Sequence, residues 1–324
     1  MSTPATPTRP APRGEAEPRD HPAQRASPTR RVLLRVGLQA LGSAGIAALA
    51  GCTTSPESVP PSPSDSSSPA PNPSGRNGNR TTPPPRVTRA HIVERYANRH
   101  GRAWGLGTAG EITRIDPAGS AVALTFDACG GPGGDGYDAA LIGLLRRRDV
   151  AATLLLNQRW IDANPGPAAE LAADPLFALG NHGRRHVPLS TSGRSAYGIR
   201  GTGDVGQIYD EVMGSCDWLA AHRPGEPIFF RAGTAFADDV AIEICREMGV
   251  LFVGFTVNGD AGATFRSAQI DTALDATRPG DVVIAHLNRP AGDTAEGFSR
   301  ALPRLLDQGL VFVRLGDRLR SIDP

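Results

Sequence analysis

Short apolar runs alternate with amphipathic stretches from about residue 88 to the end of the chain. The run at 121–127 is short and continuously apolar, as expected for a strand that is covered on both faces. Further runs of this kind predict strands at 151–156, 177–180, 228–231, 251–256, 282–286 and 310–314. Amphipathic patterns between most of these runs predict helices at 137–147, 167–173, 205–221, 238–248, 267–277 and 294–308.

This alternation of strands and helices predicts an α/β fold with a mainly parallel sheet. Six or seven strand–helix repeats favour a closed (β/α) barrel over an open sheet. Residues 88–118 precede the first repeat and are expected to form a short helix or loop. No internal sequence repeat is visible.

The first part of the chain has a different composition. Residues 1–28 are rich in Pro, Ala, Arg and Glu and contain too few large apolar side chains to form a core, so we expect disorder. Arg30 and Arg31 precede an apolar stretch at 36–50 that is short for a membrane span and ends in Gly51-Cys52. This order resembles a twin-arginine export signal followed by the lipobox of bacterial lipoproteins, in which Cys52 receives the lipid.

Three segments follow from these patterns. Residues 1–52 are predicted to be the disordered leader and lipoprotein signal, and residues 53–87, rich in Pro and Ser, an extended disordered linker. Residues 88–324 are the predicted catalytic domain. We therefore expect an exported protein that is held at the extracytoplasmic face of the cell membrane through the lipidated Cys52.

Charge and cysteine content limit the function classes. The formal net charge is +1, which gives no reason to expect nucleic acid as a partner. Apart from Cys52 the chain contains Cys129, Cys216 and Cys245, an odd number that argues against a disulfide framework. Either Cys216 pairs with Cys245, or all three are buried thiols.

A barrel of parallel strands carries its chemistry at the carboxyl ends of the strands. In this sequence, those ends bring one arginine together with carboxylates and imidazoles: Asp127, His182, His186, Arg231, Asp260 and His286. Two imidazoles and a carboxylate suit a divalent ion such as zinc or cobalt, with one position left open for water. Such an ion, together with a carboxylate base and a histidine acid, indicates hydrolysis of an amide or an ester.

The motifs at these strand ends resemble those of a known family. They are Thr125-Phe126-Asp127, His182-x-x-x-His186, Arg231 after an apolar strand, Asp260, and Ile284-Ala285-His286. In this order they resemble the five motifs of the polysaccharide deacetylases, carbohydrate esterase family four, over residues 121–315. The resemblance implies a distorted (β/α) barrel of about seven strands. It also implies the removal of N-acetyl or O-acetyl groups from a polysaccharide such as peptidoglycan, with zinc, cobalt or nickel as cofactor, and we expect a monomer.

The resemblance also assigns a role to each matching residue. Asp127 looks like the base that takes a proton from the attacking water, and His182 and His186 look like metal ligands. Arg231 looks like the residue that orients this base, with help from Asp260. His286 looks like the acid that protonates the departing sugar amine or alkoxide.

One departure from the family pattern concerns the metal. Family members carry a second Asp as a metal ligand directly after the first, but this chain has Ala128. The candidates to replace that ligand are Asp127, Asp135, Asp138 and Cys129. We favour Asp127 or Asp135, and expect Cys129 to be a small packed side chain.

Two further departures affect the walls of the expected groove. The segment after Arg231 lacks the usual prolines, and Ala261 follows Asp260 where an aromatic residue is common. Two alternative functions therefore stay open. The protein is either a catalytically inactive barrel that binds wall glycan, or a relative that hydrolyses a C–N bond in a small amide.

Overall fold

The structure, a computed structural model, describes residues 87–319 of the 324-residue chain. Of the two units into which the chain divides, only the second, residues 78–324, contains described residues. The predicted signal, Cys52 and nearly all of the predicted linker lie outside them. Within residues 87–319 no helix is long and apolar enough to cross a membrane.

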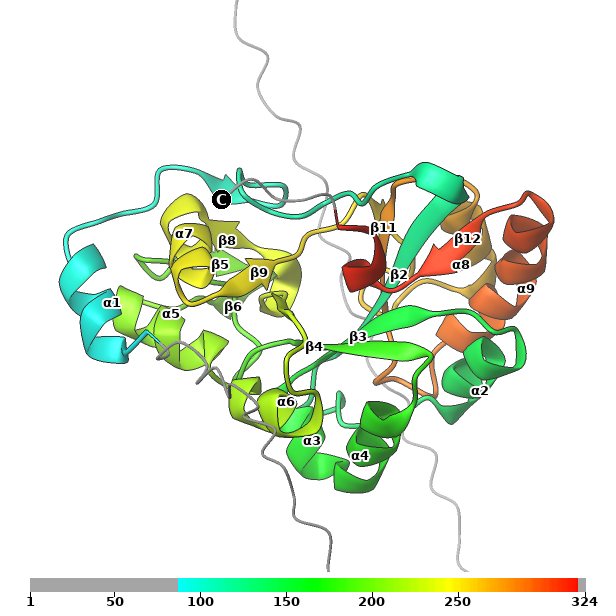
Figure 1. The fold of residues 1–324 in the computed structure, drawn as a ribbon, viewed down its shortest axis with the longest axis horizontal. Helices are drawn as coiled ribbons and strands as arrows, with labels where there is room; N and C mark the ends of the chain where they lie inside the picture. Colours follow the sequence, from blue (N-terminus) through cyan, green and yellow to red (C-terminus); the bar gives the residue numbers. More distant parts are fainter. Residues whose placement is uncertain (1–86, 320–324) are drawn as a thin grey trace, which may run out of the picture. The chain divides into compact units, whose positions relative to one another are not determined.

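Seven parallel strands form a curled half-barrel in the order β10, β11, β2, β3, β4, β7 and β9, and β12 pairs in parallel with the start of β2 (Figure 1). Their bounds are β2 Ala121–Ala128, β3 Ala152–Leu156, β4 Phe177–Asn181, β7 Ile228–Phe230, β9 Val250–Phe252, β10 Val257–Asn258, β11 Val282–His286 and β12 Val311–Val313. The predicted distorted barrel is confirmed. In the described part of the chain no ladder joins β9 to β10, so the ring is open there, whereas the number of repeats had favoured a closed barrel.

Helices cover the outside of this sheet. In Figure 1, α2, α8 and α9 lie beside β2, β11 and β12, α3, α4 and α6 lie beside β3 and β4, and α1, α5 and α7 lie on the side of β9. Their bounds are α1 Arg89–Tyr96, α2 Ala139–Arg147, α3 Gln158–Ala163, α4 Pro165–Ala173, α5 Val205–Val212, α6 Cys216–His222, α7 Asp239–Glu247, α8 Ser267–Leu274 and α9 Thr294–Asp307. Two small antiparallel pairs complete the fold, β1 Trp104–Gly105 with β8 Ala237–Asp238 and β5 Ser195–Ala196 with β6 Ile199–Arg200.

The central strand β2 divides its side chains between two faces, because successive residues of a strand point to opposite sides. One set packs in the largest core cluster: Val122, Leu124, Phe126 and Ala128. The alternate positions lead from Ala121 and Ala123 in the smallest core cluster to Thr125 and Asp127 at the carboxyl end. This alternation aims Asp127 away from the main core.

The helix predicted at 205–221 is two helices, α5 and α6, separated at 213–215. Gly214 lies against the loop after β4, where an added Cβ would come within 2.6 Å of the backbone nitrogen of Arg184. Ser215 then donates from Oγ to the carbonyl oxygen of Leu156, 2.8 Å away. This break brings the end of α5 against the loop that carries the two histidines.

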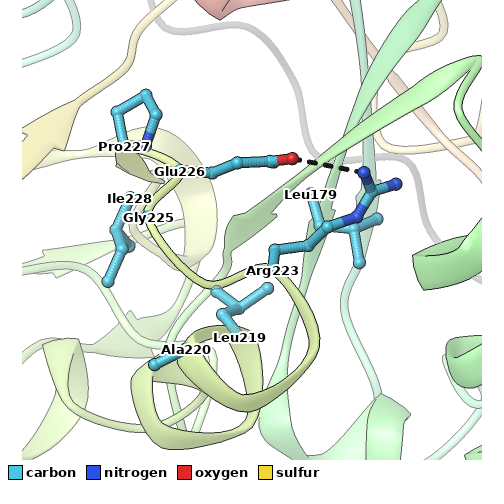
Figure 2. Close-up of a pocket in the computed structure, with 8 residues that line it drawn as sticks. All are labelled: Leu179, Leu219, Ala220, Arg223, Gly225, Glu226, Pro227 and Ile228. Carbon is cyan, nitrogen blue, oxygen red and sulfur yellow. Dashed lines mark hydrogen bonds and ion pairs between the residues drawn. The ribbon is translucent and has the colours of Figure 1, made fainter. Parts of the chain in front are cut away.

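A cavity of about 170 Å³ lies beside α6 and the start of β7, where Arg223 reaches Glu226 at 3.2 Å across its lining (Figure 2). Its other walls come mainly from apolar side chains such as Leu179, Leu219 and Ile228. None of the predicted site residues lines it, so this cavity is not the candidate site.

Candidate metal centre and acid–base groups

Three side chains at the carboxyl ends of β2 and β4 form one cluster of potential metal ligands. The Sγ of Cys129 and ring nitrogens of His182 and His186 all lie within 4.8 Å of one another. The Cys129 Sγ is 3.8 Å from Nε2 of His182, and the two imidazole rings meet edge to face with centroids 4.7 Å apart. The sequence prediction that both histidines share one site therefore agrees with the geometry.

The hydrogen bond of His182 fixes which of its nitrogens is available. Nδ1 lies 2.8 Å from the carbonyl oxygen of Arg231. A carbonyl only accepts, so Nδ1 carries a hydrogen, and Nε2 is the ring nitrogen that faces Cys129 and Asp127. Metal-bound histidines in proteins almost always have such a partner on the other ring nitrogen.

The donor set fits a divalent ion such as zinc. Two ligands of a tetrahedral zinc ion are separated by about 3.5 Å, given Zn–N and Zn–S bonds of about 2.0–2.3 Å. The separation of 3.8 Å between Cys129 and His182 is close to that value. Burial raises the pKa of the Cys129 thiol, but the charge of His186 and hydrogen bonds from the histidines outweigh it and hold this pKa well below its usual range. The thiolate is the form that binds metal.

Of the two candidates that we favour as the third ligand, Asp127 lies beside His182, with its Oδ2 3.6 Å from Nε2, whereas Asp135 lies apart from the cluster. Asp135 lies on an exposed loop, where its Oδ1 accepts a hydrogen bond from the backbone nitrogen of Gly131. It therefore does not join the histidines. Asp138 caps α2 by accepting from the nitrogen of Leu141 at 2.9 Å. Cys129, which we expected to be a packed side chain, is the third donor of the cluster.

Strand alternation explains this exchange of ligands. Ala128 is fully buried in the main core cluster, so position 128 points away from the histidines. Cys129 lies two residues after Asp127 and is the next side chain on the same side of the chain. Cys129 therefore offers a potential metal ligand in this chain, whereas in the family pattern the ligand is an Asp at the position of Ala128.

Asp127 is held as a buried anion beside this cluster. Its Oδ1 accepts from Nη1 of Arg231 at 2.7 Å, and its Oδ2 lies 3.6 Å from Nε2 of His182. Burial raises the pKa of Asp127, but the charges of Arg231, His182 and His286 outweigh burial and hold this pKa below its usual value. Asp127 is therefore a carboxylate that can accept a proton or bind a cation.

Arg231 is fully buried and uses its guanidinium to join three segments. Besides Asp127, it donates to Oγ1 of Thr125 and the carbonyl oxygen of Gly254, both at 2.9 Å. The predicted orientation of Asp127 by Arg231 agrees with these contacts.

Asp260 has a different partner from the one we predicted. Its Oδ1 lies 2.8 Å from Nδ1 of His286, and its Oδ2 accepts from the His286 backbone nitrogen at 2.7 Å and from Thr294 Oγ1 at 3.0 Å. Asp260 thus orients His286, not the pair of Asp127 and Arg231. Burial lowers the pKa of His286, but the adjacent Asp260 outweighs burial and raises this pKa well above its usual value.

A further residue that the sequence analysis did not identify, Glu211, holds the histidine loop. Glu211 lies near the end of α5 with a fully buried side chain. Its Oε1 accepts from the backbone nitrogens of Arg184 at 3.1 Å and of Arg185 and His186, each at 2.9 Å. The backbone nitrogens of four consecutive residues, 184 to 187, thus all donate to Oε1 of Glu211.

The backbone of His186 is constrained from its other side as well. It has φ of 62°, in the left-handed region that costs energy for a residue with a side chain. Gly233, from the loop after β7, packs against it, and an added Cβ there would overlap the His186 carbonyl group. Glu211 and Gly233 together fix the second histidine in its unusual conformation.

Comparison with known proteins finds a family model that matches part of this chain. The family model described as polysaccharide deacetylase matches residues 114–253, a span that includes Asp127, Cys129, both histidines and Arg231. This is less than half of the chain, and it ends before Asp260 and His286. A search of the curated proteins found no match.

Solved structures show the same fold. A peptidoglycan N-acetylglucosamine deacetylase has 19% identity and a TM-score of 0.53, with 64% of this chain and 91% of that chain covered. PdaA of Bacillus subtilis, a family 4 carbohydrate esterase, has 17% identity and a TM-score of 0.51 over 70% and 87%. A family 4 pseudoenzyme from Bacillus anthracis has 20% identity and a TM-score of 0.52 over 64% and 68%. At 17–20% identity, these matches show that the chain shares the fold of these proteins.

Proposed function

We propose that the protein is a metal-dependent hydrolase that removes acetyl groups from an N-acetylated or O-acetylated polysaccharide such as peptidoglycan. The observation that carries the proposal is the cluster of Cys129, His182 and His186, whose donor atoms lie within 4.8 Å of one another. A carboxylate base, Asp127, and a histidine acid, His286, border the same rim. A wall that only binds glycan has no need of such a pair.

The ion that fits this donor set is zinc, with cobalt or nickel as alternatives. Held by Cys129, His182 and His186, it would polarise the acetyl carbonyl and lower the pKa of the attacking water. Asp127, kept ionised by Arg231, takes the proton from that water. His286, kept protonated by Asp260, donates a proton to the departing amine nitrogen. Water thereby cleaves the C–N bond and yields acetate and a free sugar amine.

Acetate release from N-acetylglucosamine oligomers tests this proposal. We expect release by the metal-loaded protein and a loss of at least a hundredfold in His182→Ala and Asp127→Asn, since each removes a group that acts on the reacting atoms. Equal release by both variants and the parent would overturn the mechanism. Metal analysis of the purified protein provides a second check, because neither bound metal nor a gain on adding zinc, cobalt or nickel would contradict metal dependence.

The two competing functions give different results in the same assay. The similarity to a pseudoenzyme makes an inactive glycan-binding barrel the main competitor. That function predicts oligomer binding without acetate. A hydrolase of small amides predicts faster release from N-acetylglucosamine itself than from its oligomers, whereas our proposal predicts the reverse.

We further propose that the protein acts outside the cytoplasm, anchored to the membrane through a lipid on Cys52. The proposal rests on the order of paired arginines, an apolar stretch and Cys52 in the sequence. Labelled palmitate supplied to expressing cells should enter the protein, and Cys52→Ser should prevent this and release the protein from the membrane fraction. Membrane association that survives Cys52→Ser would overturn the anchor.

A further inference from the structure

We propose that a groove beside His186 binds an anionic group of the polymer, a carboxylate or a phosphate, so that the enzyme prefers an acidic glycan to a neutral one. This inference rests on the proposed function for the identity of the polymer. The binding of the anion itself does not depend on catalysis. It follows from the shape and charge of one groove.

The groove has a volume of about 410 Å³ and adjoins the histidine loop. Two of its lining residues, Arg185 and Val187, are the chain neighbours of His186 on either side. The others come from the end of the β5–β6 hairpin and the start of α5: Arg200, Gly201, Gly203 and Gln207. A polymer bound with one sugar at the metal cluster would therefore have the groove next to it.

The lining contains two guanidinium groups and no carboxylate. Arg185 contacts the buried Glu211 through Nε at 3.3 Å, but 53% of its side chain is exposed. The Glu211 carboxylate already accepts from four backbone nitrogens, so it offsets the charge of Arg185 only in part. Among residues 87–319, no ion-pair or hydrogen-bond partner holds the guanidinium of Arg200, which is exposed.

The backbone around the groove is fixed before any ligand binds. Gly201 donates to the carbonyl oxygen of Arg194 at 3.0 Å, and Thr202 donates to that of Pro188 at 3.1 Å. An added Cβ at Gly201 would come within 2.6 Å of the Arg194 oxygen, so the hairpin base is tightly packed. A site that is already ordered binds its ligand without the cost of ordering it.

Paired arginines favour one class of ligand. The planar guanidinium presents parallel N–H donors that match the two oxygens of a carboxylate or phosphate, and such charge-assisted bonds are stronger than bonds to neutral hydroxyls. A neutral sugar would leave the charge of Arg200 without a counterion and that of Arg185 only partly offset. The groove therefore distinguishes an acidic polymer from a neutral one.

Calorimetric titration of the metal-loaded full chain with acetyl-free oligosaccharides tests this proposal without any reaction. The probes are cellotetraose, the same tetrasaccharide with glucuronate units, and its 6-phosphate derivative. We expect at least one anionic probe to bind about tenfold more tightly than cellotetraose, the ratio for one additional charge-assisted contact. The probe that gains affinity identifies the group, carboxylate or phosphate.

Variants assign the effect to the groove. Arg200→Gln should remove most of the preference and leave the affinity for cellotetraose unchanged, whereas Arg148→Gln on the exposed end of α2 should change neither. Equal affinity for all three probes, or a preference that survives Arg200→Gln, would overturn the proposal. Acetate release is scored separately, so an anion preference without acetate refutes only the proposed function.

Discussion

Glu211→Gln tests whether a buried carboxylate positions the metal-binding loop. Glutamine keeps the size of the side chain and one carbonyl oxygen, but it replaces the other oxygen by an NH₂ group. In the structure, Oε2 accepts from the backbone nitrogen of Arg185 at 3.1 Å and from its Nε at 3.3 Å. The variant therefore turns two charge-assisted bonds into contacts between donors, and the nitrogens that face Oε1 lose a negative partner.

The expected loss can be worked from these contacts. A hydrogen bond to a charged group contributes about 1.5–3 kcal/mol, so two lost bonds amount to about 3–6 kcal/mol. Part of this loss destabilises the loop conformation in which His186 can bind zinc. If that part is about 2 kcal/mol, the zinc affinity drops roughly 30-fold. This agrees with the 10- to 100-fold loss that is typical when a group behind a metal ligand is replaced.

Competition with a chromophoric chelator measures this zinc affinity directly. Thermal unfolding of the metal-free variant is recorded alongside, and Glu94→Gln on the exposed face of α1 is the matched control. Glu94→Gln should change neither value. Zinc affinity within twofold of the parent in a folded Glu211→Gln protein would refute the positioning role.

Three other variants test the remaining groups of the site. Cys129→Ser should lower zinc affinity at least a hundredfold, and X-ray absorption of the parent should show one sulfur at about 2.3 Å from zinc that the variant lacks. Arg231→Met leaves the buried Asp127 charge without its partner and should lower the free energy of unfolding in urea by about 3–5 kcal/mol. Asp260→Asn removes the charge that raises the pKa of His286, so the acid loses its proton at lower pH and the alkaline limb of kcat/KM should move to lower pH.

Each of these outcomes has its own contrary result. A zinc environment of nitrogen and oxygen alone in the parent would remove Cys129 from the site. If Asp127→Asn failed to restore stability in the Arg231→Met background, the buried-charge explanation would be wrong. An alkaline limb that stays in place in Asp260→Asn would mean that His286 is not the titrating acid.

Most strands of the barrel could be predicted from the sequence because each is a short apolar run, but the two-residue strand β10 was missed. Seven predicted strands match β2, β3, β4, β7, β9, β11 and β12 to within a few residues. The prediction failed where packing overrides a local pattern. Residues 205–221 carry a continuous helical pattern, but Gly214 must lie against the backbone of Arg184, and this contact ends α5.

The site could be predicted in part for the same reason. Strand ends brought Asp127, the histidines, Arg231 and His286 to one rim, as the parallel sheet requires. Strand alternation could have identified Cys129 as the third donor of the cluster, because its side chain lies on the same side of the chain as that of Asp127. We did not favour it because we expected an acidic ligand. The contact of Asp260 with His286 depends on how the ends of two separate strands pack together. A local sequence pattern holds no information about that packing.

Glu211 could not be found from its own sequence position. It looks like one more acid on an amphipathic helix, and its burial follows from the break after α5 and the turn of the histidine loop. Its function arises only when four backbone nitrogens, distant in sequence, converge on it. Hydrogen bonds between a buried carboxylate and backbone groups so far away in the sequence can be identified only from the three-dimensional structure.

The central claim is that the cluster of Cys129, His182 and His186 holds a metal that deacetylation requires. Its most direct test is the rate of acetate release from N-acetylglucosamine oligomers while zinc is titrated into the metal-free protein. We predict no release without metal, a linear rise up to one equivalent of zinc, and no further gain beyond it. The full rate in metal-free protein, or no acetate at any zinc concentration, would contradict the claim.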